Sequence, residues 1–256
     1  MKKNVKIIFF IIFLSIVFLF IIGYYKKKSF ETRYQTLLEF VKLKKQIVVS
    51  KKTIDFGIFK FESSYVRALE INSDLSVDVI KAINDLTKLE VLILTNTNIT
   101  DETLKQIRFP KSLKVLDLVN TDITGKSLLW ISENCDLEHL DITATRICNS
   151  DLKHLNSLRN LKFLRLSMNH LDEQLFNYFN NYSIEHLNLD HLPMSNLNVS
   201  ALKSFKNLKK LEINYSGINE NIHKQLKEKL KGVEVDCSKY KFYAPKDMIK
   251  IPEGPP

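Results

Sequence analysis

Glycine, proline and cysteine are scarce in this chain of 256 residues, with six, six and three copies respectively. So little glycine and proline excludes a collagen-like repeat and a low-complexity linker. The cysteines, Cys135, Cys148 and Cys237, are odd in number and lack C-x-x-C spacing, which argues against a disulfide framework and a zinc site. We expect reduced thiols, with a Cys135–Cys148 disulfide as the alternative for a domain outside the cell.

Charged side chains are missing from residues 7–25, an apolar run with lysines on both sides. At about 1.5 Å per residue, a helix of this length spans the hydrocarbon core of a bilayer. An uncleaved anchor and a removed signal peptide are the alternatives, and the anchor is favoured because no A-x-A-like cleavage site occurs after the run. The sequence therefore predicts that the chain contacts lipid through residues 7–25 and through the basic flank Lys26, Lys27 and Lys28.

The sequence gives conflicting signals about the side of the membrane on which the rest of the chain lies. Three lysines precede the apolar run and seven basic residues come within about 20 residues after it, which by the positive-inside rule favours the cytoplasm. A short basic tail before an apolar run is also typical of a signal-anchor that exports the domain on its carboxyl-terminal side. We predict a single-pass membrane protein and favour an extracytoplasmic main domain.

The net charge of +9 is concentrated at the amino-terminal end. Residues 1–60 hold thirteen Lys/Arg against three acidic residues, a balance of +10, whereas residues 61–256 hold 25 against 26, a balance of −1. The basic residues therefore lie beside the predicted membrane segment, where they would attract anionic headgroups. The remaining chain lacks the net positive charge of a nucleic-acid-binding domain, so we expect no nucleic-acid partner.

A unit of about 24 residues recurs along most of the chain. Its starts lie 24, 24, 24, 23 and 24 residues apart, and weaker copies begin at Val66 and Leu230, which gives eight copies. The six clear copies are LEVLILTNTNIT (89), LKVLDLVNTDIT (113), LEHLDITATRIC (137), LKFLRLSMNHLD (161), IEHLNLDHLPMS (184) and LKKLEINYSGIN (208).

The fourth and sixth positions of each copy share one face of a strand because side chains alternate. Leu92 and Leu94 therefore point inward and Ile93 outward. The threonine at the ninth position, Thr97 in the first clear copy, can hydrogen-bond to the backbone of a turn. Thr100 then begins a helix as its N-cap.

This unit resembles the leucine-rich repeat, in the L-x-x-L-x-L-x-x-T-x-I-T-D form common in bacterial repeat proteins. The resemblance implies an α/β solenoid, with a curved parallel sheet on the concave face and short helices on the convex face. One copy departs from it at Leu192, followed by Pro193, where we expect a different turn. The match is clearest in Leu89, Leu92, Leu94, Thr97, Ile99, Thr100, Asp101 and Leu104.

The repeat divides the chain into four predicted segments. In the second, residues 30–46 have one apolar helical face, and residues 47–61 predict one or two short strands. The segments are a transmembrane signal-anchor (1–28), a juxtamembrane helix and N-terminal cap (29–64), the repeat domain (65–238) and a C-terminal tail (239–256).

Outward-facing strand positions, the third and fifth of each copy, align in two columns across the predicted concave face. For the last copy, this alignment places Gly232 in the third-position column and Glu234 in the fifth. The middle of the two columns mixes charge with aromatic rings, a composition typical of protein-binding surfaces. The candidate partner-binding residues are Asp117, His139, Asp141, Phe163, Arg165, His186, Asn188, Lys210 and Glu212.

Catalytic motifs are missing: no G-x-S-x-G, Walker loop, H-E-x-x-H or glycine-rich dinucleotide turn occurs. His139 and His186 lie two repeats apart, about 10 Å at the usual strand spacing, which is too far for two ligands of one zinc ion. We therefore expect no enzyme activity, metal or cofactor, and favour a membrane-anchored scaffold that binds a protein partner. The alternatives are a hydrolase or transferase that uses histidines and aspartates of the concave face, and a structural envelope spacer.

Overall fold

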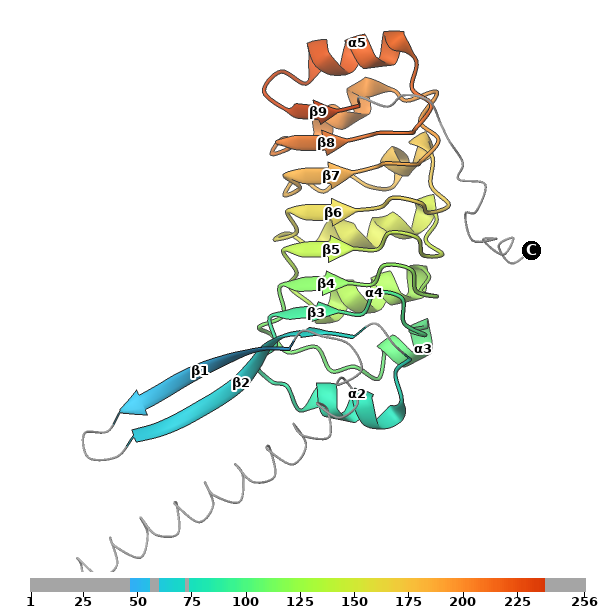
Figure 1. Cartoon of the computed structure of the whole chain (residues 1–256). Helices are drawn as coiled ribbons and strands as arrows, with labels where there is room; N and C mark the ends of the chain where they lie inside the picture. Colours follow the sequence, from blue (N-terminus) through green and yellow to red (C-terminus); the bar gives the residue numbers. More distant parts are fainter. Residues whose placement is uncertain (1–46, 56–59, 72–73, 238–256) are drawn as a thin grey trace, which may run out of the picture. The chain divides into compact units, whose positions relative to one another are not determined.

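The computed structural model describes the backbone of residues 47–55, 60–71 and 74–237, and the side chains from Arg67 onward (Figure 1). The predicted anchor at residues 7–25, its basic flank, the predicted helix at 30–46 and the tail at 239–256 lie outside these ranges. Within them, no helix is long and apolar enough to cross a membrane.

One nine-stranded sheet runs through the described residues, and its strands are arranged in chain order. Strands β1 (Ile47–Asp55) and β2 (Lys60–Glu70) form an antiparallel hairpin, and β2 also pairs in parallel with β3. From β2 onward every pairing is parallel, so eight parallel strands match the eight copies of the repeat (Figure 1). The remaining strands are β3 (Val91–Ile93), β4 (Val115–Asp117), β5 (His139–Asp141), β6 (Phe163–Arg165), β7 (His186–Asn188), β8 (Lys210–Glu212) and β9 (Glu234–Asp236).

Each of the strands β3 to β8 buries its central leucine between the sheet and the helices. Leu92 and Leu116 are completely buried, and Ile93 beside them is half-buried, as the alternation of the sequence predicts. Because neighbouring copies place leucines at the same register, these side chains form continuous columns through the stack. A single copy could not bury its apolar edge alone, so the core belongs to the stack as a whole.

After each strand the chain reverses through a residue with a left-handed backbone. The residue at the eighth position has φ between 52° and 59° in all six clear copies: Asn96, Asn120, Ala144, Met168, His191 and Tyr215. The ninth-position side chain supports this turn as expected, because Thr97 Oγ1 donates to the Leu94 carbonyl at 2.7 Å and Thr121 Oγ1 to the Leu118 carbonyl at 2.6 Å.

The copy with Leu192 uses the same backbone reversal as the others. His191 has φ of 59°, and the Leu192 side chain is fully buried. The expectation of a different turn is therefore met only in the side chain, which supplies apolar contact where Thr97 supplies a hydrogen bond. The backbone geometry is held by the next copy, because His191 N donates to the Asn214 carbonyl at 2.9 Å.

Short helices return the chain along the other side of each copy (Figure 1). Thr100 is the N-cap of α3, as predicted, and its hydroxyl accepts a hydrogen bond from Thr103 N at 3.3 Å. Three of the helices are 3-10 helices, a form that the apolar spacing does not distinguish from an α-helix. The helices of the described residues are α2 (Val77–Asn84), α3 (Asp101–Leu104), α4 (Gly125–Asn134), the 3-10 helices η1 (Asn149–Ser157), η2 (Glu173–Asn177) and η3 (Val199–Ser204), and α5 (Glu220–Lys229).

The predicted alignment of the last copy is wrong by two residues. Glu234 pairs with Lys210 and Asp236 with Glu212, so Glu234 stands in the third-position column and Gly232 outside both columns. The reason is the length of α5: Leu230 N donates to the Leu226 carbonyl at 3.0 Å, so Leu230 ends the helix at the point where the repeat predicts the start of a strand.

The strands predicted in residues 47–61 are present, and they are longer than expected. β1 has nine residues and β2 eleven, and β2 continues through the predicted boundary between residues 64 and 65 into the first copy of the repeat. The hairpin and the repeats therefore share a strand. The three cysteines are free: Cys237 is buried, Cys135 half-buried and Cys148 exposed.

Candidate functional site

The parallel register brings the nine candidate residues together on five neighbouring strands, β4 to β8. Four of them form one row across the sheet at the third position: His139, Phe163, His186 and Lys210. The other five form a second row two residues along each strand: Asp117, Asp141, Arg165, Asn188 and Glu212. We call the surface made by the third, fifth and seventh positions of the copies the strand face.

Three rings stack in the middle of the strand face. The His139 and Phe163 ring centroids lie 4.0 Å apart with planes 7° from parallel, and those of Phe163 and His186 lie 4.3 Å apart at 27°. All three side chains are half-buried, so each ring limits the freedom of the next while its edge stays open to solvent. We refer to His139, Phe163 and His186 as the aromatic stack.

Within the aromatic stack, the pKa of His139 lies below that of an ordinary histidine. Burial lowers the pKa of His139, and the nearby charges of Lys162 and His186 lower it further against the opposing effect of Glu138. The imidazole therefore behaves as a flat, weakly polar ring beside Phe163.

Asp117 and Asp141 lie side by side on β4 and β5 next to the aromatic stack. Asp117 Oδ1 accepts hydrogen bonds from Thr95 Oγ1 at 2.7 Å and Val119 N at 3.0 Å. Burial raises the pKa of Asp117, and the charge of Asp141 adds to this effect. We call Asp117 and Asp141 the carboxylate pair.

The cations of the strand face lie against its acidic groups. Arg165 is 3.5 Å from Asp141 Oδ2; the arginine side chain is 64% exposed and the aspartate side chain 16%, which makes this a long ion pair that is solvated at the arginine. Lys210 lies between Glu212 and Glu234, with Nζ–Oε1 distances of 3.4 and 3.3 Å. Hydrogen bonds to Glu234 and Glu212 raise the pKa of Lys210, so it stays charged.

Asn188 links its neighbour Glu212 in the second row to residues at the seventh position of the copies. Its Nδ2 donates to Glu212 Oε2 at 2.8 Å, and its Oδ1 accepts hydrogen bonds from the Ser167 hydroxyl and from Asp190 N. These bonds fix the amide orientation, so Asn188 presents a set pattern of polar atoms.

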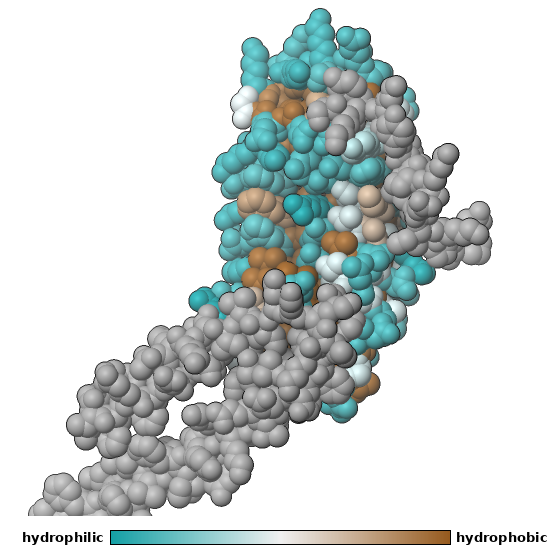
Figure 2. All heavy atoms as spheres, in the orientation of Figure 1, coloured by the Kyte–Doolittle hydropathy of each residue, from teal (hydrophilic) through white to brown (hydrophobic). Residues whose placement is uncertain are grey.

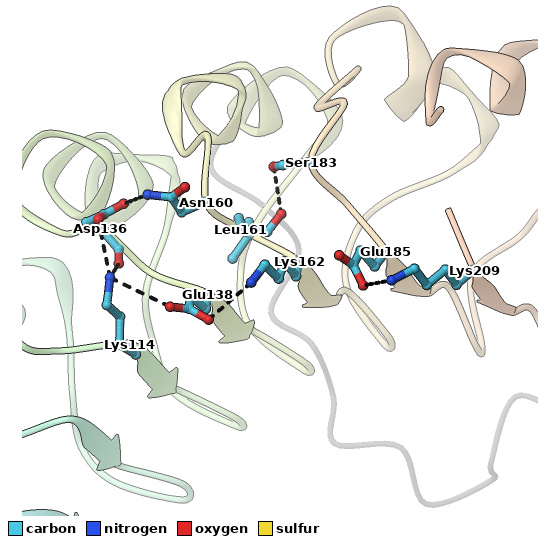
Figure 3. Close-up of polar contacts among 9 residues, drawn as sticks. All are labelled: Lys114, Asp136, Glu138, Asn160, Leu161, Lys162, Ser183, Glu185 and Lys209. Atoms are coloured by element: carbon cyan, nitrogen blue, oxygen red, sulfur yellow. Dashed lines mark hydrogen bonds and ion pairs between the residues drawn. The ribbon is translucent and has the colours of Figure 1, made fainter. Parts of the chain in front are cut away.

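A second set of polar residues, at the second position of the copies, is not among the residues that the sequence pattern singles out. Here the charge alternates from copy to copy in Arg67, Glu90, Lys114, Glu138, Lys162, Glu185 and Lys209. Figure 3 shows part of this charge ladder: Lys114 and Lys162 reach Glu138 at 3.8 and 3.4 Å, and Lys209 reaches Glu185 at 2.6 Å. The signal that could have identified the ladder is the alternation of sign down the second position of the aligned copies.

Two features of hydrolytic and metal centres are missing from the part of the chain that the structure describes. Among the described residues, neither His139 nor His186 hydrogen-bonds to a carboxylate, as a general base oriented for catalysis would. Groups of three His, Cys, Asp or Glu side chains that could hold a metal ion are also missing from this part of the chain. Figure 2 shows a surface that is mostly hydrophilic, with separate hydrophobic patches among the stacked strands.

No family model and no curated protein sequence matches the chain. Solved structures that resemble it include a Pollen Receptor Kinase 3, with 15% identity over 84% of this chain and 98% of that chain and a TM-score of 0.38. The ectodomain of the Arabidopsis receptor kinase HAESA, in complex with an N-terminally extended IDA peptide hormone ligand, has 17% identity over 65% of this chain and 28% of that chain, with a TM-score of 0.39. The ectodomain of SOBIR1 from Arabidopsis thaliana has 15% identity over 83% and 94%, with a TM-score of 0.27.

The architecture is assigned from the strand ladder itself. The six clear copies place their leucines in register, reverse at the eighth position and return through a short helix. This is an α/β solenoid built from leucine-rich copies.

Proposed function

We propose that the chain is a membrane-anchored leucine-rich-repeat scaffold that binds a partner protein through the strand face of β4 to β8. Residues 7–25 would supply the anchor, with Lys26, Lys27 and Lys28 among the lipid headgroups, and the repeats would lie outside the cytoplasm. We also propose that the repeats are of the L-x-x-L-x-L-x-x-T-x-I-T-D form common in bacterial repeat proteins.

The aromatic stack is the observation that supports this proposal most directly. Its rings stand on a sheet, where the parallel ladder holds each backbone in place, and they stack within 4.0 to 4.3 Å of one another. Rings held this way lose little conformational entropy when a partner binds, and aromatic side chains dominate the energetics of many interfaces. Polar groups of fixed orientation, such as Asn188, surround them.

Photo-cross-linking from a single position tests this function. A benzophenone side chain in place of Asn188 should give one discrete adduct in membranes from the source cells, and excess unmodified protein should suppress it. The same side chain in place of Lys153, exposed in η1 on the helical side, is the matched control and should give no such adduct. Phe163→Ala should abolish the adduct at 188, and equal adducts from both positions would refute the proposal.

The side of the membrane is tested separately by a membrane-impermeant lysine reagent applied to intact cells. Labelling of exposed lysines such as Lys153 is the expected result for an extracytoplasmic domain. Protection of all these lysines until the cells are lysed would place the repeats in the cytoplasm.

A further inference from the structure

Negative charge is concentrated on the strand face. Residues 67–237 carry 21 Lys/Arg and 23 Asp/Glu, a balance of only −2. The third, fifth and seventh positions of the strand face hold seven acidic residues and two basic ones, a balance of −5. The acidic residues are Glu70, Asp117, Asp141, Asp190, Glu212, Glu234 and Asp236, and the basic ones are Arg165 and Lys210.

The two ends of this surface differ in how their acidic groups are neutralised. Lys210 lies between Glu212 and Glu234. In the carboxylate pair, Asp141 has a long contact with Arg165, whereas Asp117 feels the Arg165 charge but forms no ion pair within the residues that the structure describes. The acidic groups beside the aromatic stack therefore remain available to a cation from outside.

We infer that the strand face binds a basic, extended segment of the partner protein, with an apolar or aromatic residue of that segment on the aromatic stack. This inference rests on the proposed function and adds the chemistry of the partner. A lysine or arginine of the segment would lie between Asp117 and Asp141, which stand on adjacent strands about 4.8 Å apart. One cationic group can contact both carboxylates at that separation.

The spacing along the strand fits an extended segment. His139 and Asp141 are two residues apart on β5 and point to the same side, so they lie about 6.6–6.8 Å apart along the strand. Side chains two residues apart in an extended peptide have the same spacing. A residue on the aromatic stack and a basic residue two positions away would thus reach both features together.

Arg165 is the internal competitor of the incoming cation. It shares Asp141 with that cation, and its exposed, 3.5 Å contact is easily broken. Removal of the Arg165 charge should therefore strengthen binding, whereas removal of the carboxylate charges should weaken it. Opposite effects from neighbouring residues distinguish this site from a general loss of structure.

The test uses the full chain in phosphatidylcholine nanodiscs and a fluorescein-labelled peptide with three copies of Ser-Lys-Ser-Phe. Fluorescence anisotropy should show saturable binding that empty nanodiscs lack. The double variant Asp117→Asn/Asp141→Asn should weaken binding about tenfold, and Arg165→Gln should tighten it about threefold. A peptide with glutamate for lysine should not bind.

The matched control removes two carboxylates from the helical side. Glu102 in α3 and Glu133 in α4 are exposed, so Glu102→Gln/Glu133→Gln changes the net charge equally without touching the strand face. Binding should stay within about twofold of the wild type. An equal loss in this control, or no gain in Arg165→Gln, would overturn the inference.

Two further outcomes separate this inference from the proposed function. If the adduct at position 188 forms and depends on Phe163 while the peptide fails to bind, the face binds a partner that is not basic, and only the inference falls. If a peptide of residues 26–45 displaces the probe more strongly than unlabelled probe does, the occupant is the chain's own basic segment, and the assignment to a partner falls.

Discussion

The eighth position shows how a single residue can be forced into an unfavourable backbone conformation by its neighbours. Asn96 and Asn120 have φ near 55°, in the left-handed region that asparagine tolerates. Ala144 also adopts φ of 53°, although its Cβ comes too close to the following carbonyl oxygen in this conformation. The backbone of the copies on either side imposes the turn, since Ala144 N donates to the Ser167 carbonyl at 2.9 Å.

We therefore expect Ala144→Gly to raise the free energy of unfolding by about 1 kcal/mol, because glycine removes the left-handed penalty. Urea denaturation followed by circular dichroism measures this change. Ala201→Gly, in η3, is the control and should lower the free energy of unfolding by about 0.5–1 kcal/mol. A loss of stability in both variants would mean that the turn at Ala144 is unstrained.

Asp101 connects two successive copies through its carboxylate. Its Oδ1 and Oδ2 accept hydrogen bonds from Thr124 N at 2.9 Å and Thr124 Oγ1 at 2.7 Å, and Ser127 N and its hydroxyl donate at 3.2 and 2.5 Å. Burial raises the pKa of Asp101, but the hydrogen bonds from Ser127 and Thr124 outweigh burial and hold the pKa below its ordinary value.

A lowered folded-state pKa means that Asp101 stabilises the protein above the ordinary aspartate pKa and stops doing so as the pH falls through the folded-state pKa. Asp101→Asn should therefore cost about 1–3 kcal/mol at neutral pH, and the cost should shrink on acidification. Urea denaturation at a series of pH values measures the difference. In the control Glu102→Gln, at an exposed position, the difference should stay near zero. A cost that grew on acidification would contradict the assigned pKa direction.

Among the elements, the strands β3 to β8 depend on their central leucines. Leu140 in β5 is 2% exposed and lies in register between Leu116 and Leu164. Leu140→Ala should lower the free energy of unfolding by about 2–5 kcal/mol because it leaves a cavity shared by three copies. Urea denaturation measures the loss. Ile93→Ala, at a half-buried position on the strand face, should cost clearly less, and equal losses would argue against a core built from the leucine columns.

The sequence predicts elements where local chemistry and periodicity agree. The alternation of Leu92, Ile93 and Leu94 is sufficient to predict a strand and its inward face, and the repeat then implies the parallel pairing. The end of α5 could not be predicted, because Leu230 fits both a strand start and a helix end. The hydrogen bond of Leu230 N to Leu226 decides between them, and that bond depends on how far the last helix extends before the chain turns.

The candidate site was predictable as two rows of residues but not as a set of contacts. Register alone places His139, Phe163 and His186 in one row. Whether the rings would stack or splay apart depends on side-chain torsions that the sequence does not fix. The neutralisation of Lys210 by two glutamates also required the true register of β9, because Glu234 reaches Lys210 only when it stands in the same column.

At the scale of the whole molecule, the charge ladder connects copies that are distant in sequence along one edge of the strands. Its members are partly exposed, with 36% for Glu138 and 44% for Lys162, so each ion pair contributes little to stability. The alternation of charge sign still matters, because a stack misaligned by one copy would place like charges next to each other. The ladder therefore favours the observed order of copies over misaligned stacking.

Glu138 is the best point at which to test the ladder, since it lies between Lys114 at 3.8 Å and Lys162 at 3.4 Å (Figure 3). Glu138→Gln should lower the free energy of unfolding by about 0.5–1 kcal/mol in low salt, because two cations lose their shared partner. The difference should shrink in about 1 M NaCl, where charges are screened within about 3 Å. Glu133→Gln, exposed in α4, provides the control and should have no effect at either salt concentration. A cost for Glu138→Gln that persisted in high salt would assign its role to packing, and the alternating charges would then have no part in holding the copies in order.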